Sequence, residues 1–280
     1  MTSVVIAAHN EEAVIGRCLD ALFADRPPGP LDVTVVANGC TDATAQVAGA
    51  RIGVRVVDRP EPGKPGALNA GDAVAVGFPR VYLDADIVLS PGTLSALMRA
   101  LDSGDLLAAV PGRQLDLAGR PVLVRAYYAI NRRLPAFRRS LFGRGAIALS
   151  AAGRARFDTF PAMTADDLFL DGLFGPGEKR EVEGFTSVVA TPLRTRDLVR
   201  RLVRVRAGNA RMRAVNANVR ASVRSSWLRD VVLPRPWLAP AALCYVGITL
   251  LAAVLARRQL RAGVEGWGRD ESSRQHTMAG

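Results

Sequence analysis

The sequence predicts an α/β protein in which a mostly parallel central sheet is flanked by helices, with a hydrophobic helix near the C-terminus. Short runs of consecutive apolar residues, typical of strands buried on both faces, occur at 3–8, 32–37, 54–57 and 81–87. Stretches with helical or turn patterns separate these runs. Strand-helix-strand units of this kind have right-handed crossovers and parallel strands.

The first of these units shows the pattern most clearly. After the first strand, Asn10 is a favourable N-cap residue, and Glu11 and Glu12 suit the positive end of a helix dipole. Apolar side chains then recur along one stripe as far as Phe23, and the prolines of 26–30 end the stretch. The sequence therefore predicts a helix that begins directly after Asn10.

Polar or glycine-rich loops follow the predicted strands. Residues 38–42 read Asn-Gly-Cys-Thr-Asp, and residues 60–71 carry several glycines and Lys64 just before a helix. Open parallel sheets bind ligands at the carboxyl ends of their strands, and a glycine-rich loop before a helix can cradle a phosphate. The second loop departs from the P-loop pattern, so an ordinary Pro/Gly connection is the competing interpretation.

The strand at 81–87 ends in two carboxylates one residue apart, Asp84 and Asp86. Alternation along a strand puts both on one face, where the chain leaves the sheet. Such close carboxylates repel each other unless a cation lies between them, and hard oxygen ligands suit Mg²⁺ or Mn²⁺. A solvated turn is the competing interpretation of Asp-x-Asp taken alone.

The second half of the chain is less regular. Residues 106–110 predict a strand, residues 121–137 a helix, and residues 141–150 a glycine-rich loop that enters a strand. Asp166 and Asp167 then stand at the start of a helix, where carboxylates also suit the dipole without any further role. Adjacent residues of a helix point apart, so at most one of the two faces a cleft.

The formal net charge of +11 favours an acidic partner: phosphate groups, nucleic acid or anionic lipid. Only Lys64 and Lys179 among the 37 basic residues are lysines. The three cysteines have no metal-ligand spacing, which indicates a reducing compartment.

Ordered motifs in the N-terminal part resemble those of the family 2 glycosyltransferases, which have the GT-A (Rossmann-like) fold. The matching segments are 5–12, 38–44, 63–71 and 83–86. Together they are far more specific than any one of them. The resemblance implies a hexosyltransferase-type enzyme that moves a sugar from a nucleotide-diphosphate sugar to an acceptor hydroxyl.

The resemblance also implies roles for individual residues. It places Asn38 and Asp42 near the base and ribose, Lys64 near the diphosphate, and Asp84 and Asp86 at the ribose and a divalent cation, Mg²⁺ or Mn²⁺. An alanine precedes Asn38 where the family has an acidic pair, so the base stays open. Further donor-binding candidates are Ala8, Asn10, Glu12 and Asn69.

On the acceptor side, the family has an acidic pair whose aspartate deprotonates the acceptor hydroxyl. Aligning the pair as a pair makes Asp167 the general base and Asp166 its neighbour, and a one-residue shift exchanges them. Transfer with inversion needs a base on one side of the anomeric carbon and a stabilised diphosphate on the other. We interpret His9, at the first strand's end, as a cleft-lining residue rather than a base.

Residues 194–224 form the most basic stretch. Arg201-Leu-Val-Arg204-Val205 resembles a family signature that ends in tryptophan, and the valine favours non-processive, single transfer. Arg201 and Arg204, three apart on a helix, are donor-binding candidates that could reach a diphosphate together. A solvated basic face near anionic lipid explains the rest of the run.

The segment 238–256 contains 19 residues without a charge and has basic residues on both sides. As a helix it would extend about 28 Å, enough to cross a hydrocarbon core. A buried terminal helix and a helix lying in the membrane interface are the competing interpretations. We expect contact with the cytoplasmic face of the cell membrane, either single-pass or peripheral.

The expected organisation is a catalytic domain at 1–225, a membrane-associated or transmembrane helix at 226–260 and a polar tail at 261–280. Within the first, residues 1–100 would bind the nucleotide sugar and residues 101–225 the acceptor. That acceptor hydroxyl belongs to a lipid-linked compound, a saccharide or a small molecule.

Two other function classes compete with a metal-dependent, inverting glycosyltransferase. Charge alone suggests a non-enzymatic basic module for anionic membrane or nucleic acid. Nucleic-acid binding predicts aromatic residues among the arginines of 194–224, which has none, so we expect no nucleic acid. A sugar nucleotidyltransferase predicts a glycine-rich loop after the first strand, where this chain reads Ala8-His-Asn-Glu.

Overall fold

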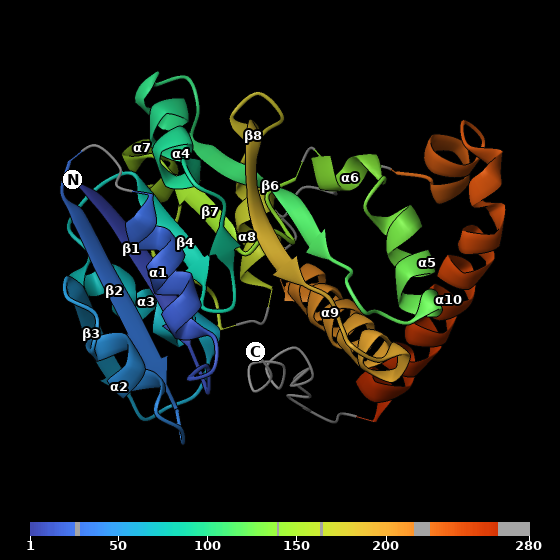
Figure 1. The fold of residues 1–280 in the computed structure, drawn as a ribbon, viewed down its shortest axis with the longest axis horizontal. Coiled ribbons are helices and arrows are strands. Elements are labelled where there is room, and N and C mark those ends of the chain that lie inside the picture. Colours follow the sequence, from blue (N-terminus) through green and yellow to red (C-terminus); the bar gives the residue numbers. More distant parts are fainter. Residues whose placement is uncertain (26–28, 139, 163–164, 216–224, 263–280) are drawn as a thin grey trace. The chain divides into compact units, whose positions relative to one another are not determined.

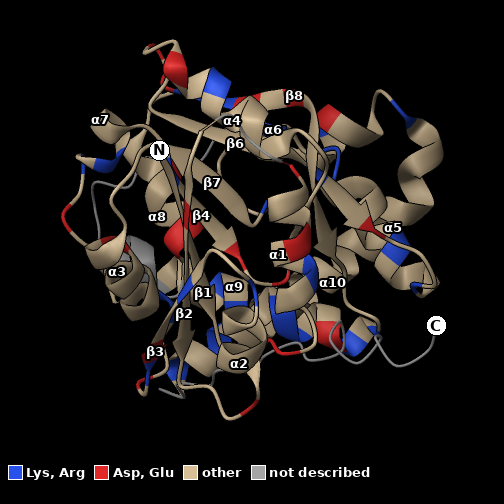
Figure 2. Cartoon of the chain, turned by 60° about the vertical axis from the view of Figure 1, so that its left-hand side comes forward, with Lys and Arg blue, Asp and Glu red and all other residues tan. Residues whose placement is uncertain are grey.

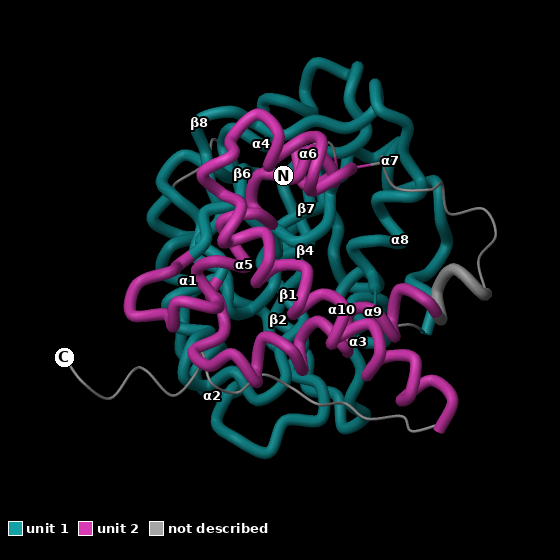
Figure 3. The backbone as a smooth tube through the Cα atoms, turned by 90° about the vertical axis from the view of Figure 1, so that its right-hand side faces the viewer, with its two compact units in different colours: residues 1–115, 141–189 teal, residues 116–140, 190–280 magenta. Residues whose placement is uncertain are grey.

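The computed structural model describes residues 1–25, 29–138, 140–162, 165–215 and 225–262. The chain forms two compact units. Unit 1 comprises residues 1–115 and 141–189, and unit 2 comprises residues 116–140 and 190–280 (Figure 3).

An eight-stranded sheet with the order β3-β2-β1-β4-β7-β6-β8-β5 is the framework of unit 1 (Figure 1). Its parallel strands are β1 (Thr2–Ala8), β2 (Leu31–Asn38), β3 (Val54–Arg59) and β4 (Arg80–Asp84). The sheet continues with β5 (Val88–Leu89), β6 (Ala108–Asp116), β7 (Ala146–Leu149) and β8 (Lys179–Ala190). Strand β7 is antiparallel to β4 and β6, and β5 is antiparallel to β8. The α/β prediction is confirmed: the predicted parallel strands form one half of a mixed sheet.

Helices pack on both faces of the parallel strands. On one face, Ile6 of β1 and Leu19 of α1 are fully buried in the same apolar cluster. Val5 points to the other face, where a Cβ on Gly71 of α3 would lie 2.3 Å from Val5 Cγ1, so only glycine lets that helix approach. The helices of unit 1 are α1 (Ile15–Ala24), α2 (Thr44–Gly49), α3 (Lys64–Val74), α4 (Thr93–Asp102), α7 (Ala151–Arg154) and α8 (Asp166–Leu173).

The prediction that Asn10 caps the first helix is wrong. Helix α1 begins at Ile15, after a turn in which the Glu11 carbonyl accepts hydrogen bonds from the N–H groups of Val14 and Ile15. Asn10 has a φ of 53°, and its side-chain oxygen accepts a hydrogen bond from the Thr41 N–H at 2.8 Å. The Asn10 amide therefore joins two loops, and this contact outcompetes local capping.

The strand that carries the two aspartates ends earlier than predicted. Strand β4 stops at Asp84, and the Ile87 N–H donates to the Asp84 carbonyl at 3.1 Å, which closes a turn over Ala85 and Asp86. The two carboxylates are therefore placed by a strand end and the turn after it, and strand alternation does not relate them.

Unit 2 is built of helices around a small apolar cluster that includes Ile130, Val231 and Ala242. Helix α10 packs against α5 and α9, and the rings of Tyr127 and Tyr245 stack 5.1 Å apart. The helix predicted at 121–137 is broken into two. The elements are α5 (Val122–Asn131), α6 (Pro135–Arg138), α9 (Thr195–Val215), a π-helix (Trp227–Val232), a 3₁₀ helix (Pro236–Leu238) and α10 (Ala239–Arg261).

One buried carboxylate ties α3, β4 and α7 together. Asp72 lies 2.5 Å from a guanidinium nitrogen of Arg80 and 3.0 Å from Nε of Arg154. It also accepts a hydrogen bond from the Tyr82 hydroxyl at 2.9 Å, and burial with the Asp72 charge raises the pKa of Tyr82. Because the Asp72 side chain is only 6% exposed, its charge depends on these partners instead of water.

We expect Asp72→Ala to lower the free energy of unfolding by about 3–5 kcal/mol, because the change leaves buried arginine charge unpaired. The matched control is Asp20→Ala, which removes an ion pair with Arg51 from a side chain that is 61% exposed. Its loss should be about 1 kcal/mol or less. Urea denaturation of the two variants measures the difference, and equal losses would contradict the role given to Asp72.

Candidate active site

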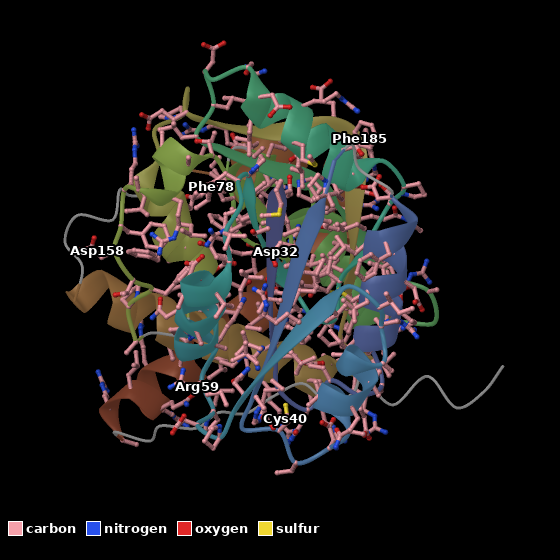
Figure 4. The ribbon with its side chains drawn as sticks, turned by 90° about the vertical axis from the view of Figure 1, so that its left-hand side faces the viewer. Asp32, Cys40, Arg59, Phe78, Asp158 and Phe185 are labelled. Carbon is pink, nitrogen blue, oxygen red and sulfur yellow. The ribbon has the colours of Figure 1, made fainter. Side chains whose placement is uncertain are left out.

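The carboxyl ends of the parallel strands bring most of the predicted donor residues of unit 1 to one edge of the sheet. In the register, Ala8 of β1 pairs with Ala37 of β2, and Ala7 pairs with Asp84 of β4. Cys40 and Arg59, which follow β2 and end β3, lie at the same edge (Figure 4). The polar loops therefore gather there, as parallel strands predict.

Asn38 links two backbone segments at this edge. Its side-chain nitrogen donates to the Ala8 carbonyl at 2.6 Å, and its side-chain oxygen accepts from the Gly63 N–H at 2.9 Å. The residue is only 2% exposed. Asn38 thus positions the loop before α3, and contact with the nucleotide base remains a prediction.

Asp42 and Glu12 fix the loops that follow β1 and β2. The Asp42 carboxylate accepts hydrogen bonds from the N–H groups of Thr44 (3.1 Å) and Glu12 (3.2 Å), so it fixes the turn that leads into α2. Glu12 reciprocates by accepting from the Ala43 N–H at 2.8 Å. Together with Asn10, these residues link the loop after β1 to the loop after β2, and their donor-binding roles stay predictions.

Lys64 joins the two candidate motifs. Its ammonium lies 2.6 Å from a carboxylate oxygen of Asp84 and 2.8 Å from one of Asp166. Although burial opposes it, the charges of Asp166 and Asp84 raise the pKa of Lys64 above its ordinary value. A predicted donor-side residue and a predicted acceptor-side residue thus share the Lys64 ammonium.

Asp84 is held by its own backbone as well. Its N–H donates to the Gly145 carbonyl at 2.7 Å, next to the start of β7. Gly145 has a φ of 66°, and a Cβ there would lie 2.3 Å from Ile87 Cγ1 and 3.2 Å from an Asp84 oxygen. Glycine is therefore required at this close approach.

The negative charges of Asp84 and Asp86 both influence the Cys18 thiol. Burial, with the charges of Asp86 and Asp84, raises the pKa of the Cys18 thiol, whose sulfur lies 3.7 Å from the Asp84 carbonyl oxygen. Among the residues that the structure describes, no group of three or more His, Cys, Asp or Glu side chains is placed to hold a metal. The Lys64 ammonium, which contacts Asp84, shows that this edge accommodates a positive charge. The two carboxylates suit a hard divalent cation whose remaining ligands would be water molecules or phosphate oxygens.

Asp167 has a different environment from Asp166. It accepts hydrogen bonds from the N–H groups of Gly143 at 3.1 Å and Leu168 at 2.8 Å. Burial, and next the charge of Asp166, raise its pKa to about 6, while Lys64 and the Gly143 N–H act in the opposite direction. A carboxylate with such a pKa can take up and release a proton near neutral pH.

The sequence did not reveal the contacts that support this acidic pair. Asp171, one helical turn after Asp167, accepts a hydrogen bond from the Leu141 N–H at 2.7 Å and lies 2.5 Å from the Lys179 ammonium. Helix α8 is therefore hydrogen-bonded to the loop before β7 at two points, Asp171 to Leu141 and Asp167 to Gly143. The one signal in the sequence was that Lys179 is one of only two lysines in the chain, which makes that residue notable.

Two other sets of candidates have structural contacts. Asn69 both donates to and accepts from the backbone of Phe160, at 3.1 and 2.7 Å, which holds α3 to that segment. Arg201 and Arg204 belong to α9 of unit 2, where Arg201 donates to the Ala190 carbonyl at 3.1 Å. Every other candidate lies in unit 1, and donor binding by the two arginines stays a prediction.

Comparison with known proteins decides the family. A model described as glycosyl transferase family 2 matches residues 3–157, more than half of the chain. The chain belongs to this glycosyltransferase family. The match covers β1 to β7 and so includes the whole predicted donor edge.

Curated relatives are named as glycosyltransferases. An uncharacterized glycosyltransferase of Mycobacterium tuberculosis is 39% identical over 117 residues, which are 42% of this chain and 50% of the relative. One from Nostoc is 26% identical over 114 residues, 39% of this chain and 35% of that protein. The matches thus span half of these relatives' length or less.

Solved glycosyltransferases share the fold. A mannosyltransferase from Pyrobaculum calidifontis, in complex with GDP-mannose and Mn²⁺, has a TM-score of 0.59 at 20% identity, covering 94% of this chain and 81% of that one. TarS of S. aureus (residues 1–349), in complex with UDP-GlcNAc, has a TM-score of 0.52 at 13% identity, covering 94% and 92%. The GT-A fold predicted for this glycosyltransferase family member is confirmed.

We expect Gly145→Ala to destabilise the protein by about 1–3 kcal/mol more than Gly119→Ala, because only the first crowds a packed side chain. The two glycines have φ values of 66° and 64°, and a Cβ at Gly119 would meet nothing within 4 Å. Backbone strain is therefore matched, and chemical denaturation isolates the contact with Ile87. Equal destabilisation would show that the close approach to Asp84 tolerates a methyl group.

Proposed function

We propose that this protein transfers a sugar from a nucleotide-diphosphate sugar to an acceptor hydroxyl. The observation that carries the proposal is the Lys64 bridge, which joins Asp84 at the donor edge to Asp166 beside the base candidate. Family membership supports the reaction class. The chemistry requires this adjacency, because bond formation and leaving-group departure occur at one anomeric carbon.

On the donor side, Lys64, Asp84 and Asp86 would bind the diphosphate and a divalent cation, Mg²⁺ or Mn²⁺. When bound, that cation would neutralise charge that develops on the leaving diphosphate. Lys64 stands at the first turn of α3, directly after Gly63, whose backbone Asn38 orients. The Mn²⁺ in the complex of the P. calidifontis mannosyltransferase supports a metal-dependent reaction in this chain.

On the acceptor side, Asp167 would remove the proton of the attacking hydroxyl, and the transfer would invert the anomeric centre. Its pKa of about 6 leaves it largely ionised at neutral pH and still basic enough to accept a proton. Asp166 is the less favoured base because one of its oxygens lies 2.8 Å from Lys64, on the donor side.

Further features belong to the same proposal. Val205, which stands where the family signature has tryptophan, is 45% exposed and supports single, non-processive transfer. Similar structures bind GDP-mannose or UDP-GlcNAc, so the donor base and sugar are best found by screening. We place the reaction at the cytoplasmic face of the cell membrane, with α10 as the contact and a lipid-linked, saccharide or small-molecule acceptor.

We expect Asp86→Ala to reduce metal-dependent turnover of nucleotide sugars at least about 100-fold, because a ligand for the cation is lost. A screen of nucleotide sugars for hydrolysis with Mn²⁺ or Mg²⁺ provides the assay. Asp102→Ala, at the exposed end of α4, is the matched control and should keep full turnover. Unchanged activity of Asp86→Ala, with normal thermal unfolding, would remove the metal-site hypothesis.

We expect Asp167→Asn to lower transfer by about 10²- to 10⁴-fold while donor affinity stays near the wild-type value, because the amide cannot accept the proton. The base works in its ionised form, so wild-type kcat/KM should rise with pH, with the midpoint of the rise at about pH 6. In Asp167→Asn that rise should disappear.

Asp166→Asn serves as the comparison for this measurement. It should mainly weaken donor binding, because its contact is with Lys64. If Asp166→Asn instead abolishes the pH-dependent rise and Asp167→Asn retains it, the assignment of the base is reversed.

A further inference from the structure

A stripe of large apolar side chains runs along the exposed face of α10. Leu243 and Leu250 are seven residues apart, and Leu250 and Val254, like Leu251 and Leu255, are four apart, so these side chains share one side of the helix. The exposed stripe consists of Leu243 (77% exposed), Leu250 (60%), Leu251 (50%), Val254 (46%) and Leu255 (36%). Trp237, which is 71% exposed, and Leu233, at 66%, extend apolar exposure before the helix begins.

The opposite face of α10 packs against the other helices of unit 2. Ala242, Ile248, Ala252 and Ala256 are buried, and the helix packs against α5 and α9. In the most apolar 18-residue stretch of this segment only 17% of the residues are buried, so α10 is not a core helix. The competing interpretation as a buried terminal helix is therefore wrong for this structure, and membrane contact remains.

The neighbours of α10 argue against a membrane crossing. Helix α9 packs along it and carries Arg200, Arg201, Arg204 and Arg206 in its described part (Figure 2). Arg206 lies close enough to Tyr245 of α10 for its charge to act on the pKa of that tyrosine. If α10 crossed a bilayer, these arginines would enter hydrocarbon beside it, which is strongly unfavourable.

The charges around the stripe favour an anionic surface. Arg257, Arg258 and Arg261 end the helix, and Arg229 and Arg235 precede it. No charged residue interrupts the helix between Ala239 and Ala256. An apolar stripe with arginines at its ends and an exposed tryptophan fits the boundary between acyl chains and anionic headgroups.

We propose that the exposed stripe docks onto an anionic lipid bilayer with α10 parallel to the membrane plane, so that the helix does not span it. This inference rests on the membrane contact in the proposed function and specifies its geometry. Its tests need no sugar transfer, so its failure is distinguishable from failure of the enzymatic proposal.

The first test is flotation of the full chain with vesicles of phosphatidylcholine, alone or mixed with phosphatidylglycerol. We expect binding to the mixed vesicles and a loss of more than about tenfold in the double variant Leu243→Glu/Leu250→Glu. Ile52→Glu is the matched control, since Ile52 is apolar and 98% exposed but lies in unit 1. Unchanged binding of the double variant overturns the proposal. The proposal is also overturned if the wild-type chain does not bind vesicles but forms a dimer that the double variant cannot form.

The second test measures depth with bromine-labelled lipids that quench tryptophan. In the first variant, Trp227→Phe/Trp267→Phe, Trp237 is the single tryptophan. In the second variant all three tryptophans are replaced by Phe and Leu250→Trp supplies the single tryptophan. Positions 237 and 250 are 13 residues apart, about 20 Å along a helix. Equal, shallow quenching at both positions supports a helix in the membrane plane. Quenching that is shallow at 237 and deep at 250 shows a spanning helix and overturns the proposal.

Discussion

The ion pairs of Lys64 with Asp84 and Asp166 are the interaction on which the site depends. They connect the start of α3, the end of β4 and the start of α8, which are far apart in the chain. Without the ammonium, the two carboxylates would face each other across the same space. Backbone hydrogen bonds hold each participant: Gly63 to Asn38 before Lys64, and Asp84 to Gly145. Lys64 therefore bridges positions that the scaffold sets independently.

The same dependence explains why Asn38 stands where the family has an acidic residue. Its amide donates to the Ala8 carbonyl and accepts from the Gly63 N–H, so both functions of the group are used. An ionised aspartate accepts hydrogen bonds but cannot donate one, and it would leave the Ala8 carbonyl without this partner. The asparagine thus fixes the distance between β1 and the loop that delivers Lys64. It suits a scaffold role whether or not the residue also touches the donor.

The sequence predicted those parts that depend on local pattern. Apolar runs predicted the parallel strands because burial on both faces leaves a local signature, and strand ends located Asp84. The cap at Asn10 failed because a partner 31 residues away, Thr41, competes for its side chain. The pairing of Asp171 with Lys179 was missed for a related reason, since ion pairs between elements have no periodicity. Long-range contacts therefore complete the site that local patterns outline.

The charge balance of the site has a chemical consequence. Asp84, Asp86, Asp166 and Asp167 supply four carboxylates, and Lys64 is the ammonium that contacts two of them. The raised pKa of Asp167 reflects burial and this negative surrounding. A nucleotide diphosphate would add further negative charge, and one lysine does not balance it. Under the proposed function, a divalent cation on Asp84 and Asp86 would supply added positive charge, and Lys64 would then turn toward the phosphates.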